Sequence, residues 1–561
     1  MGCTSGLAGV LLKSIVHKIH YWIVTKVHFE DQIFFYVVFP FLGIVLTTII
    51  VITLFKGNDR KGLGEVLNEI AQKSSIISSV KMYSQIIQSA VTVGLGGSAG
   101  LESPIAVTGA AIGSNFAQTY RLGYKERTLL LAAGASAGIA SAFNAPIAGI
   151  MFAFEILLTG VVFSDFIPLV VAAVCGSLLS RILLQEDVLF RFYTRQSFDY
   201  HNIPYYLILG VVSGFYARYF VLIYHKTEHV INSFKLSRLR KAMIGGAALS
   251  LLCVLLPPLF GEGYDTLKTL TNGDTSGIIE HSFFGYLDLG SWTVIIFLAL
   301  VCILKAFATS ITIFSGGNGG NFAPSLFAGG TFGFLFAMVC KQFGLIDVPI
   351  SNLVLAGMAA VMSGVLYAPL TAIFLIAESS QGYDLFIPLM IVSVISYLMA
   401  KWFSAVNPDY KPMIDQGKIF SNEYDNNLIY TLQLRDYIDR KSQTIEADAP
   451  ISDFFELIKN GKKNIFAVID KEKFLQGVLT MDDIRPYLFN KDQELPANIH
   501  QIMQAAPAVV HFTDNAVAIL KTFDDTGAWH LPVIDENDKF IGFISKSKIL
   551  TGYRQLLKDY S

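Results

Sequence analysis

Long apolar stretches limit what this chain can fold into more than any other feature of its sequence. A helix needs about 20 apolar residues to cross the hydrocarbon core of a bilayer. Hydrophobic residues make up 53% of the chain and charged residues only 15%, which excludes an ordinary soluble domain. The sequence predicts an all-α polytopic membrane domain in which glycine and proline interrupt several helices. Runs with little or no charge occur at Phe34–Phe55, Val161–Ser180, Ala242–Phe260, Gly290–Gly317 (with one lysine, Lys305), Leu353–Ile376 and Leu385–Ala400.

Two short glycine-to-proline motifs, Gly100-Leu-Glu-Ser-Pro104 and Gly320-Asn-Phe-Ala-Pro324, each open an apolar segment. Glycine lets the backbone approach an ion, and proline in the first turn favours a helix start. The free N–H groups and the positive dipole end of such a helix attract anions. We therefore expect the motifs, including Gly100 and Gly320, to form two halves of one anion site. Asn321 and Phe322 would supply backbone N–H groups to it.

The apolar part of the chain contains an internal repeat. The segment Gly134–Glu155 aligns without gaps onto Gly357–Glu378, and both segments carry an Ala-Pro pair and a closing glutamate. Duplicated halves of this kind commonly pack with opposite orientation and form a substrate site from interrupted helices. We predict repeats at about 1–190 and 200–410. Glu155 and Glu378 are expected to be structural, because they close equivalent helices and can accept hydrogen bonds from nearby backbone donors.

The composition changes between Pro408 and Asn427, where long apolar runs give way to mixed charged sequence. We place the membrane domain at about 1–425 and a soluble tail at about 430–561. Two segments of the tail, Ile465–Ile484 and Leu531–Leu550, show apolar alternation on both sides of a charged turn. This pattern predicts a strand, a turn, a strand and a helix in each segment. The tail is expected to be a small α/β domain.

These motifs resemble those of the CLC family of chloride channels and chloride/proton exchangers, over nearly the whole chain. The family's second and third signatures appear as the two glycine-to-proline motifs. The first is eroded to Arg60-Lys-Gly-Leu-Gly-Glu65, and the family's late anion-binding tyrosine falls at Tyr410. The resemblance implies the CLC fold, with two inverted repeats of interrupted helices. It also implies a multi-pass homodimer in the cell membrane, with one pathway in each subunit and the tail in the cytoplasm.

Glu102 is the residue that we expect to gate this pathway. A carboxylate at a helix start inside a membrane is favoured by the dipole, and it is also a tethered anion able to occupy the chloride site. Protonation would release the side chain and admit an ion, which makes anion and proton movement depend on each other. The alternative is a capping glutamate that only stabilises the helix start.

A second acidic group separates an exchanger from a channel. The family's intracellular proton glutamate maps onto Glu186, which would pass protons toward Glu102, and a surface glutamate at a helix end is the alternative. A passive channel has no use for such a group, so Glu186 favours a chloride/proton antiporter over a passive gated chloride channel. Tyr410 would offer a hydroxyl to the anion or lie in an interfacial belt. Phe322 would wall the path or serve in core packing alone.

Three residues near the expected site depart from the family pattern. Lys61 stands where most members have a serine that touches the anion. Pointing inward it would bind anions tightly, and pointing outward it would reach the membrane surface and steer ions. Leu101 replaces a basic residue and Ser103 a glycine. A fluoride-selective transporter and a transport-dead anion sensor therefore stay as less favoured alternatives to chloride exchange.

The tail resembles a tandem pair of CBS domains, which commonly follow CLC membrane domains. In such pairs a Ser/Thr-x-x-Asp sequence after the second strand can hold an adenine nucleotide. Thr480-Met-Asp-Asp483 fits this pattern, whereas Ser545-Lys-Ser-Lys548 has lysine in place of the aspartate. The resemblance implies at most one complete nucleotide site. Capping of a helix by Thr480 and Asp483 is the alternative.

Other function classes find no support in the sequence. The net charge is −2, and no basic stretch is dense enough to bind nucleic acid. The five cysteines are scattered and lack the spacing of a metal site. No nucleophile, base and orienting group occur together, so we expect neither enzymatic activity nor catalytic residues. The expected partners are chloride, protons and the bilayer, and the one cofactor considered is a regulatory adenine nucleotide.

Overall fold

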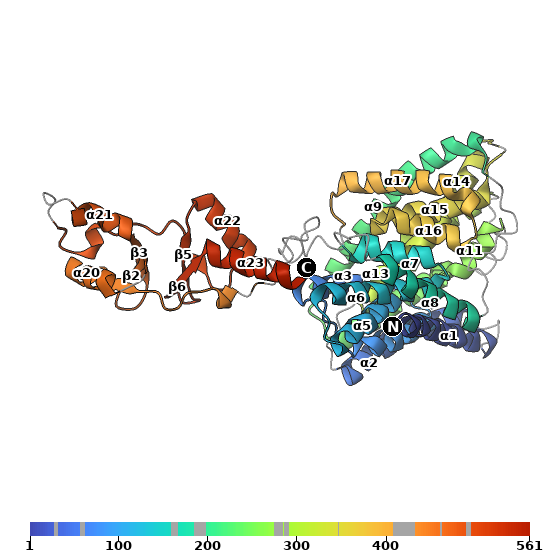
Figure 1. Ribbon diagram of the computed structural model, residues 1–561. Coiled ribbons are helices and arrows are strands. Elements are labelled where there is room, and N and C mark those ends of the chain that lie inside the picture. Colours follow the sequence, from blue (N-terminus) through green and yellow to red (C-terminus); the bar gives the residue numbers. More distant parts are fainter. Residues whose placement is uncertain are drawn as a thin grey trace. The chain divides into compact units, whose positions relative to one another are not determined.

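The structure is a computed structural model that divides the chain into two compact units, Met1–Asn422 and Glu423–Ser561 (Figure 1). In its described part, the first unit consists of helices and their connections, and the second combines helices with two small sheets. The described residues are 1–26, 32–55, 62–158, 166–184, 198–273, 284, 291–345, 347–407, 432, 434–460, 463–489 and 495–560.

The first half of the helical unit begins with two long helices and continues with shorter ones. Its elements are α1 (Gly2–Lys26), α2 (Gln32–Leu54), α3 (Leu63–Gln72), α4 (Lys81–Gly94), α5 (Glu102–Thr119), α6 (Tyr124–Phe143), α7 (Pro146–Phe152), the π-helical turn η2 (Ala153–Leu157) and α8 (Phe166–Leu184). Helix α6 lies at the centre of this half, since it packs against α1, α5, α7 and α8.

The second half repeats this arrangement, with α15 in the central place. Its elements are η4 (Tyr200–Asn202), α9 (Ile203–Ser233), α10 (Arg238–Leu255), η5 (Pro257–Leu259), α11 (Tyr264–Thr271), α13 (Ser291–Phe314), α14 (Phe322–Gln342), α15 (Ile350–Leu366), α16 (Pro369–Ser379), η7 (Tyr383–Leu385) and α17 (Phe386–Phe403). Helix α15 packs against α9, α14, α16 and α17, and all its residues after Ile350 are buried.

Glycines bring equivalent helix pairs into close contact in the two halves. Helices α5 and α6 meet at Gly109 and Gly134, where a Cβ atom on either residue would collide with the carbonyl oxygen of the other. Helices α14 and α15 make the same contact through Gly329 and Gly357. Small residues allow membrane helices to pack backbone to backbone in this way. Because Gly134 aligns with Gly357, the contact belongs to the repeated unit.

The helical membrane domain predicted from the apolar runs is confirmed. Within the described residues, six helical segments are long and apolar enough to cross a membrane. A lipid-facing surface is consistent with the many exposed large hydrophobic side chains of these segments, such as Ile167, Ile208 and Leu398. The segments are Phe34–Leu54, Phe166–Leu184, Tyr200–Ser233, Trp292–Phe314, Phe322–Gln342 and Tyr383–Phe403.

One apolar run of the sequence is not a single helix. The run Leu353–Ile376 is divided between α15 and α16, because Tyr367 adopts a left-handed conformation (φ 58°) and Pro369 starts a new helix. The aligned residue of the first repeat, Asn144, has φ 55° and precedes the helix that begins at Pro146. Left-handed backbone is uncommon outside glycine. Both repeats therefore break at the same place, and the sequence run alone could not reveal it.

The closing glutamates of the two repeats cap each other's helices. Glu155 accepts two backbone hydrogen bonds from the first turn of α16 and a third from the Thr371 hydroxyl. Glu378 accepts two backbone hydrogen bonds from the first turn of α7. The structural role predicted for both residues is therefore confirmed, and the reciprocity requires α7 and α16 to run antiparallel. The backbone N–H donors, 2.7 to 3.1 Å from the carboxylate oxygens, are Leu370 and Thr371 for Glu155 and Ile147 and Ala148 for Glu378.

The second unit contains two copies of one α/β arrangement, which confirms the predicted strand, turn, strand and helix. In each three-stranded sheet the first two strands pair in parallel and the last two antiparallel. The first copy has β1 (Thr444–Glu446), α20 (Ile451–Asn460), β2 (Ile465–Ile469), β3 (Leu475–Thr480) and α21 (Met481–Phe489), and the second has β4 (Val510–His511), α22 (Ala516–Thr526), β5 (His530–Ile534), β6 (Phe540–Ser545) and α23 (Lys546–Tyr560).

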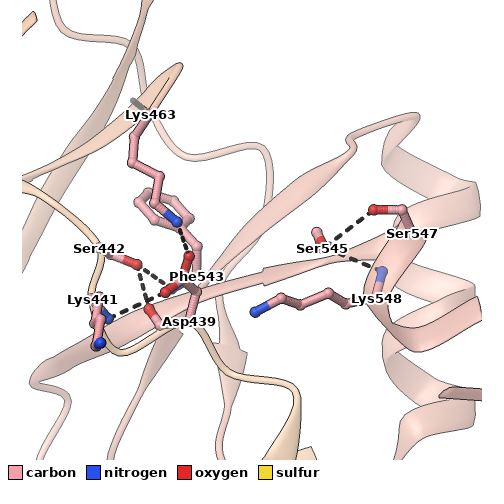
Figure 2. Close-up of polar contacts among 8 residues, drawn as sticks. All are labelled: Asp439, Lys441, Ser442, Lys463, Phe543, Ser545, Ser547 and Lys548. Carbon is pink, nitrogen blue, oxygen red and sulfur yellow. Dashed lines mark hydrogen bonds and ion pairs between the residues drawn. The ribbon is translucent and has the colours of Figure 1, made fainter. Parts of the chain in front are cut away.

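The segment before β1 ties these two copies together. The backbone N–H of Asp439 donates to the carbonyl of Phe543 in β6, at 2.8 Å. The carboxylate of Asp439 forms an ion pair with Lys463, two residues before β2. Figure 2 shows the Lys463 side chain directed onto this carboxylate. The hydrogen bond from Lys463 holds the pKa of the Asp439 carboxyl below its usual range.

We expect loss of a reciprocal cap to destabilise the helical unit. Glu378→Ala leaves two N–H groups at the start of α7 without this acceptor, which should cost about 2 kcal/mol. Glu378→Gln keeps one amide oxygen as an acceptor and should cost less. Thermal unfolding of the full chain in detergent micelles would rank the two variants, and equal midpoints for Glu378→Ala and wild type would contradict the capping role.

The Asp439–Lys463 pair should make a pH-dependent contribution to the stability of the tail. Because folding lowers the pKa of Asp439, the pair stabilises the tail above the ordinary aspartate pKa of about 4 and loses this effect as the pH falls further. The pair is partly exposed, so we expect at most about 1 kcal/mol. In Asp439→Asn, hydrogen exchange of the segment around β1 should be up to about fivefold faster at pH 7. Unchanged exchange would contradict this.

Candidate functional site

The structure brings the two glycine-to-proline motifs into direct contact. The N–H of Gly100 donates to the carbonyl of Gly320, and the N–H of Gly320 donates back to the carbonyl of Gly100, both at 2.9 Å. A Cβ atom on Gly100 would clash with Glu102 Oε2, and one on Gly320 would clash with the side chain of Ser103. Any larger residue at either position would therefore have to displace the side chain of Glu102 or Ser103.

Each motif starts a helix directly after this paired backbone. Glu102 is the first residue of α5, and Phe322 is the first residue of α14. Pro104 and Pro324 each lie in the first turn. A backbone N–H in that turn has no intrahelical acceptor, so proline, which lacks an N–H, breaks no helical hydrogen bond there. Two helix starts inside an apolar unit thus face the same region, and their unsatisfied N–H groups create a positive potential there.

The carboxylate of Glu102 lies between these two helix starts and is only 3% exposed. Its Oε1 atom accepts a hydrogen bond of 2.6 Å from the Tyr264 hydroxyl. Its Oε2 atom is buried against Gly100 and faces the backbone N–H groups of Glu102 and Ala323, without a hydrogen bond of ordinary geometry among the described residues. The carboxyl group of Glu102 therefore occupies the place that the helix starts make favourable for an anion.

Three residues around Glu102 were not identified from the sequence. Tyr264 binds Glu102 directly, and Glu262 accepts a 3.2 Å hydrogen bond from the N–H of Leu101. Lys305 is fully buried. Two sequence signals point to these residues: Glu262 lies between two glycines, and Lys305 is the single charge in an apolar run. Neither signal shows which residue lies beside it in the fold.

Asn321 and Phe322 lie where the motif places them. Asn321 precedes the first turn of α14, and Phe322 is 1% exposed. The Phe322 ring packs against Phe143 and Phe152, with ring centroids 5.5 and 6.4 Å apart. The ring therefore serves in core packing at a position next to the helix starts. Its role as a wall of an ion path stays a prediction.

Lys61, Glu186 and Tyr410 lie outside the described residues, so the roles predicted for them stay predictions. A helix begins within the eroded motif that contains Lys61, since α3 starts at Leu63. Glu65, in the first turn of α3, forms an ion pair with Lys81.

The Ser/Thr-x-x-Asp sequence of the first tail copy lies at the start of α21. Asp483 Oδ2 accepts hydrogen bonds from the backbone N–H and the hydroxyl of Thr480, at 2.7 and 2.6 Å. This is the geometry of a helix cap, and it also places a hydroxyl and a carboxylate together. In the second copy, Lys548 extends toward Asp439 (Figure 2), and the two charges interact. The position that carries Asp483 in the first copy thus carries a lysine in the second.

Several relatives have sequences similar to this chain. A putative chloride channel protein, ClcB-like, of Ralstonia nicotianae is 26% identical over 419 residues, which cover 71% of this chain and 92% of the relative. The H(+)/Cl(-) exchange transporter ClcA of Vibrio cholerae is 29% identical, over 54% of this chain and 62% of that protein. The chloride channel protein CLC-f of Arabidopsis thaliana is 26% identical, over 76% of this chain and 61% of that protein.

Solved structures share the fold. A slow cyanobacterial Cl-/H+ antiporter matches with a TM-score of 0.63 and 20% identity, over 75% of this chain and 97% of that one. A CLC-type fluoride/proton antiporter matches with a TM-score of 0.59 and 22% identity, over 73% and 95%. The family model described as voltage gated chloride channel matches residues 43–401, and the CBS domain model matches residues 434–490 and 499–554. The chain therefore belongs to the voltage-gated chloride channel (CLC) family and carries a pair of CBS domains.

Proposed function

We propose that this protein exchanges chloride for protons across a membrane and that Glu102 couples the two ions. The position of the Glu102 carboxylate carries this proposal, because it lies between two helix starts and is held by Tyr264. A side chain in that position is a tethered anion that competes with chloride for the same N–H groups.

The competition gives a simple mechanism. While Glu102 is ionised, the positive helix ends attract its carboxylate and exclude chloride. Protonation removes this attraction, and the side chain swings away, so that chloride occupies the N–H groups at the starts of α5 and α14. Movement of chloride past this position then requires binding or release of a proton by Glu102. Gly100 and Gly320 keep the backbone close to the ion, and Asn321 and Phe322 supply N–H groups.

Some relatives support exchange, and others support the rival. The Vibrio ClcA relative is named as an H(+)/Cl(-) exchange transporter, and the cyanobacterial structure is that of a Cl-/H+ antiporter. The Ralstonia relative is named as a putative chloride channel and the Arabidopsis relative as a chloride channel protein, which keeps a passive channel as the second candidate. We infer chloride as the anion, with fluoride as the alternative that the second antiporter structure raises.

Other parts of the proposal come from the family resemblance. Glu186 would deliver protons to Glu102, and Tyr410 and Lys61 would contact or attract the anion. The protein would be a homodimer in the cell membrane with its tail in the cytoplasm. An adenine nucleotide held by Thr480 and Asp483 would regulate transport, with the hydroxyl and the carboxylate at the start of α21 as its ribose contacts.

Replacing the coupling carboxylate should separate chloride movement from proton movement. Glu102→Gln keeps the size of the side chain and its acceptor for Tyr264, but it cannot ionise. In proteoliposomes, a chloride gradient should drive uphill proton movement through the wild type. It should drive chloride movement alone through Glu102→Gln.

An exposed glutamate provides the control for this experiment. Glu126→Gln, at the start of α6, should keep wild-type coupling, since that side chain lies outside the site. Uphill proton movement by Glu102→Gln would remove Glu102 from the mechanism. Chloride flux without proton movement in the wild type would establish the passive channel instead.

Substitution of two neighbouring aspartates can distinguish a nucleotide-binding role of Asp483 from a helix-capping role. Asp483→Ala should lower ATP binding to the full chain by about tenfold, the loss expected for one charge-assisted hydrogen-bonding group. Asp482→Ala removes an equal charge from a largely exposed side chain that pairs with Arg485, and it should bind ATP as the wild type does. Calorimetric titration that detects no ATP binding to the wild type would leave capping as the function of Asp483.

A further inference from the structure

A second carboxylate lies beside Glu102, on a different segment of the chain. Glu262 Oε1 accepts the N–H of Leu101, the residue directly before Glu102 in the first motif. It also interacts electrostatically with Glu102. Tyr264, two residues after Glu262, donates its hydroxyl to Glu102. The two acidic groups are therefore joined through the backbone on one side and through Tyr264 on the other.

The loop around Glu262 is held in a fixed geometry. Gly261 and Gly263 flank the glutamate and have φ angles of 61° and 90°, which favour glycine. The N–H of Gly261 donates to the carbonyl of Gly96, at 3.1 Å, in the connection that leads from α4 to Glu102. A Cβ atom on Gly263 would clash with the ring of Phe327. The backbone on both sides of Glu262 therefore has little freedom to move away from Glu102.

Lys305 places a buried amino group next to this loop. Its ammonium donates to the Ser98 hydroxyl at 2.9 Å and to the Gly261 carbonyl at 3.2 Å. It also lies 4.6 Å from the centre of the Phe327 ring. The charge of Lys305 interacts with that of Glu262. The side chain is fully buried, so its charge acts on its neighbours with little screening by water.

The balance of charges determines how this cluster holds protons. Among the described residues, the charged or titratable groups that act on the two carboxylates are Lys305 from α13, Tyr264 from α11 and Lys13 from α1. Lys13 acts on both carboxylates, and Lys305 acts on Glu262. Like charges on neighbouring buried carboxylates disfavour double ionisation, so the pair is most stable when one of them carries a proton.

We propose that Glu102 and Glu262 form a coupled acidic pair that binds one proton more tightly than the second, with Lys13 and Lys305 as the neighbouring basic groups. Glu262 thereby sets the pH range over which Glu102 releases its proton and excludes chloride. This inference rests on the proposed exchange function, and it assigns to Glu262 a positioning role that acts through Glu102.

Two substitutions should shift the pH profile of chloride transport in opposite directions. Glu262→Gln keeps an acceptor for the Leu101 N–H but removes a negative neighbour, so Glu102 should lose its proton more readily. The pH of half-maximal transport should fall by about one to two units, the shift expected when one nearby like charge is removed. Lys305→Met removes the positive neighbour, and the midpoint should rise. Glu262→Asp restores the charge and should return the profile toward that of the wild type.

The experiment is chloride flux through proteoliposomes from about pH 4 to 9, with Asp265→Asn as the matched control. The Asp265 side chain is 87% exposed, so its loss changes the net charge equally and should leave the midpoint unchanged. A Glu262→Gln profile that overlies the wild type, or one that matches the shift of Asp265→Asn, would overturn the inference even if Lys305→Met does not fold. Failure of the wild type to move protons would instead contradict the proposed exchange function.

Discussion

The structure depends on one constraint of the bilayer, which is that backbone N–H and C=O groups away from water must find partners inside the protein. Interrupted helices create such groups in the apolar unit, at the starts of α5, α7, α14 and α16. The chain satisfies them by pairing one repeat with the other. Gly100 and Gly320 exchange two backbone hydrogen bonds, and Glu155 and Glu378 cap helices of the opposite repeat.

The same constraint explains the chemistry of the candidate site. After Gly100 and Gly320 have paired, the next N–H groups of α5 and α14 still lack intrahelical acceptors. The carboxylate of Glu102 faces these groups, and Glu262 accepts the N–H of Leu101. A transport site requires acceptors that can leave, since conduction needs binding that is not too strong. Protonation makes a carboxylate a weaker hydrogen-bond acceptor, so the side chain can leave. A backbone carbonyl cannot be protonated in this way.

Much of this could be predicted from the sequence, because the features involved are local. Glycine and proline mark the helix starts at Glu102 and Phe322, and apolar alternation marks the strands of the tail. The partners of buried charges could not be predicted in this way. Tyr264 and Glu262 lie far along the chain from Glu102, and no periodicity relates them. Lys305 stands out as a single charge in an apolar run, but only the fold shows that it contacts Ser98 and the Gly261 carbonyl.

The exchange of caps between the repeats has a consequence for the order of synthesis. Helix α7 is made long before Glu378, and α16 is the segment that brings this residue to the start of α7. Until then the first turn of α7 lacks the acceptor that it has in the finished protein. Contacts so distant in sequence form late and slowly. The first repeat should therefore emerge from the ribosome incomplete and depend on its own duplicate, and not on a chaperone alone, to close its helix starts.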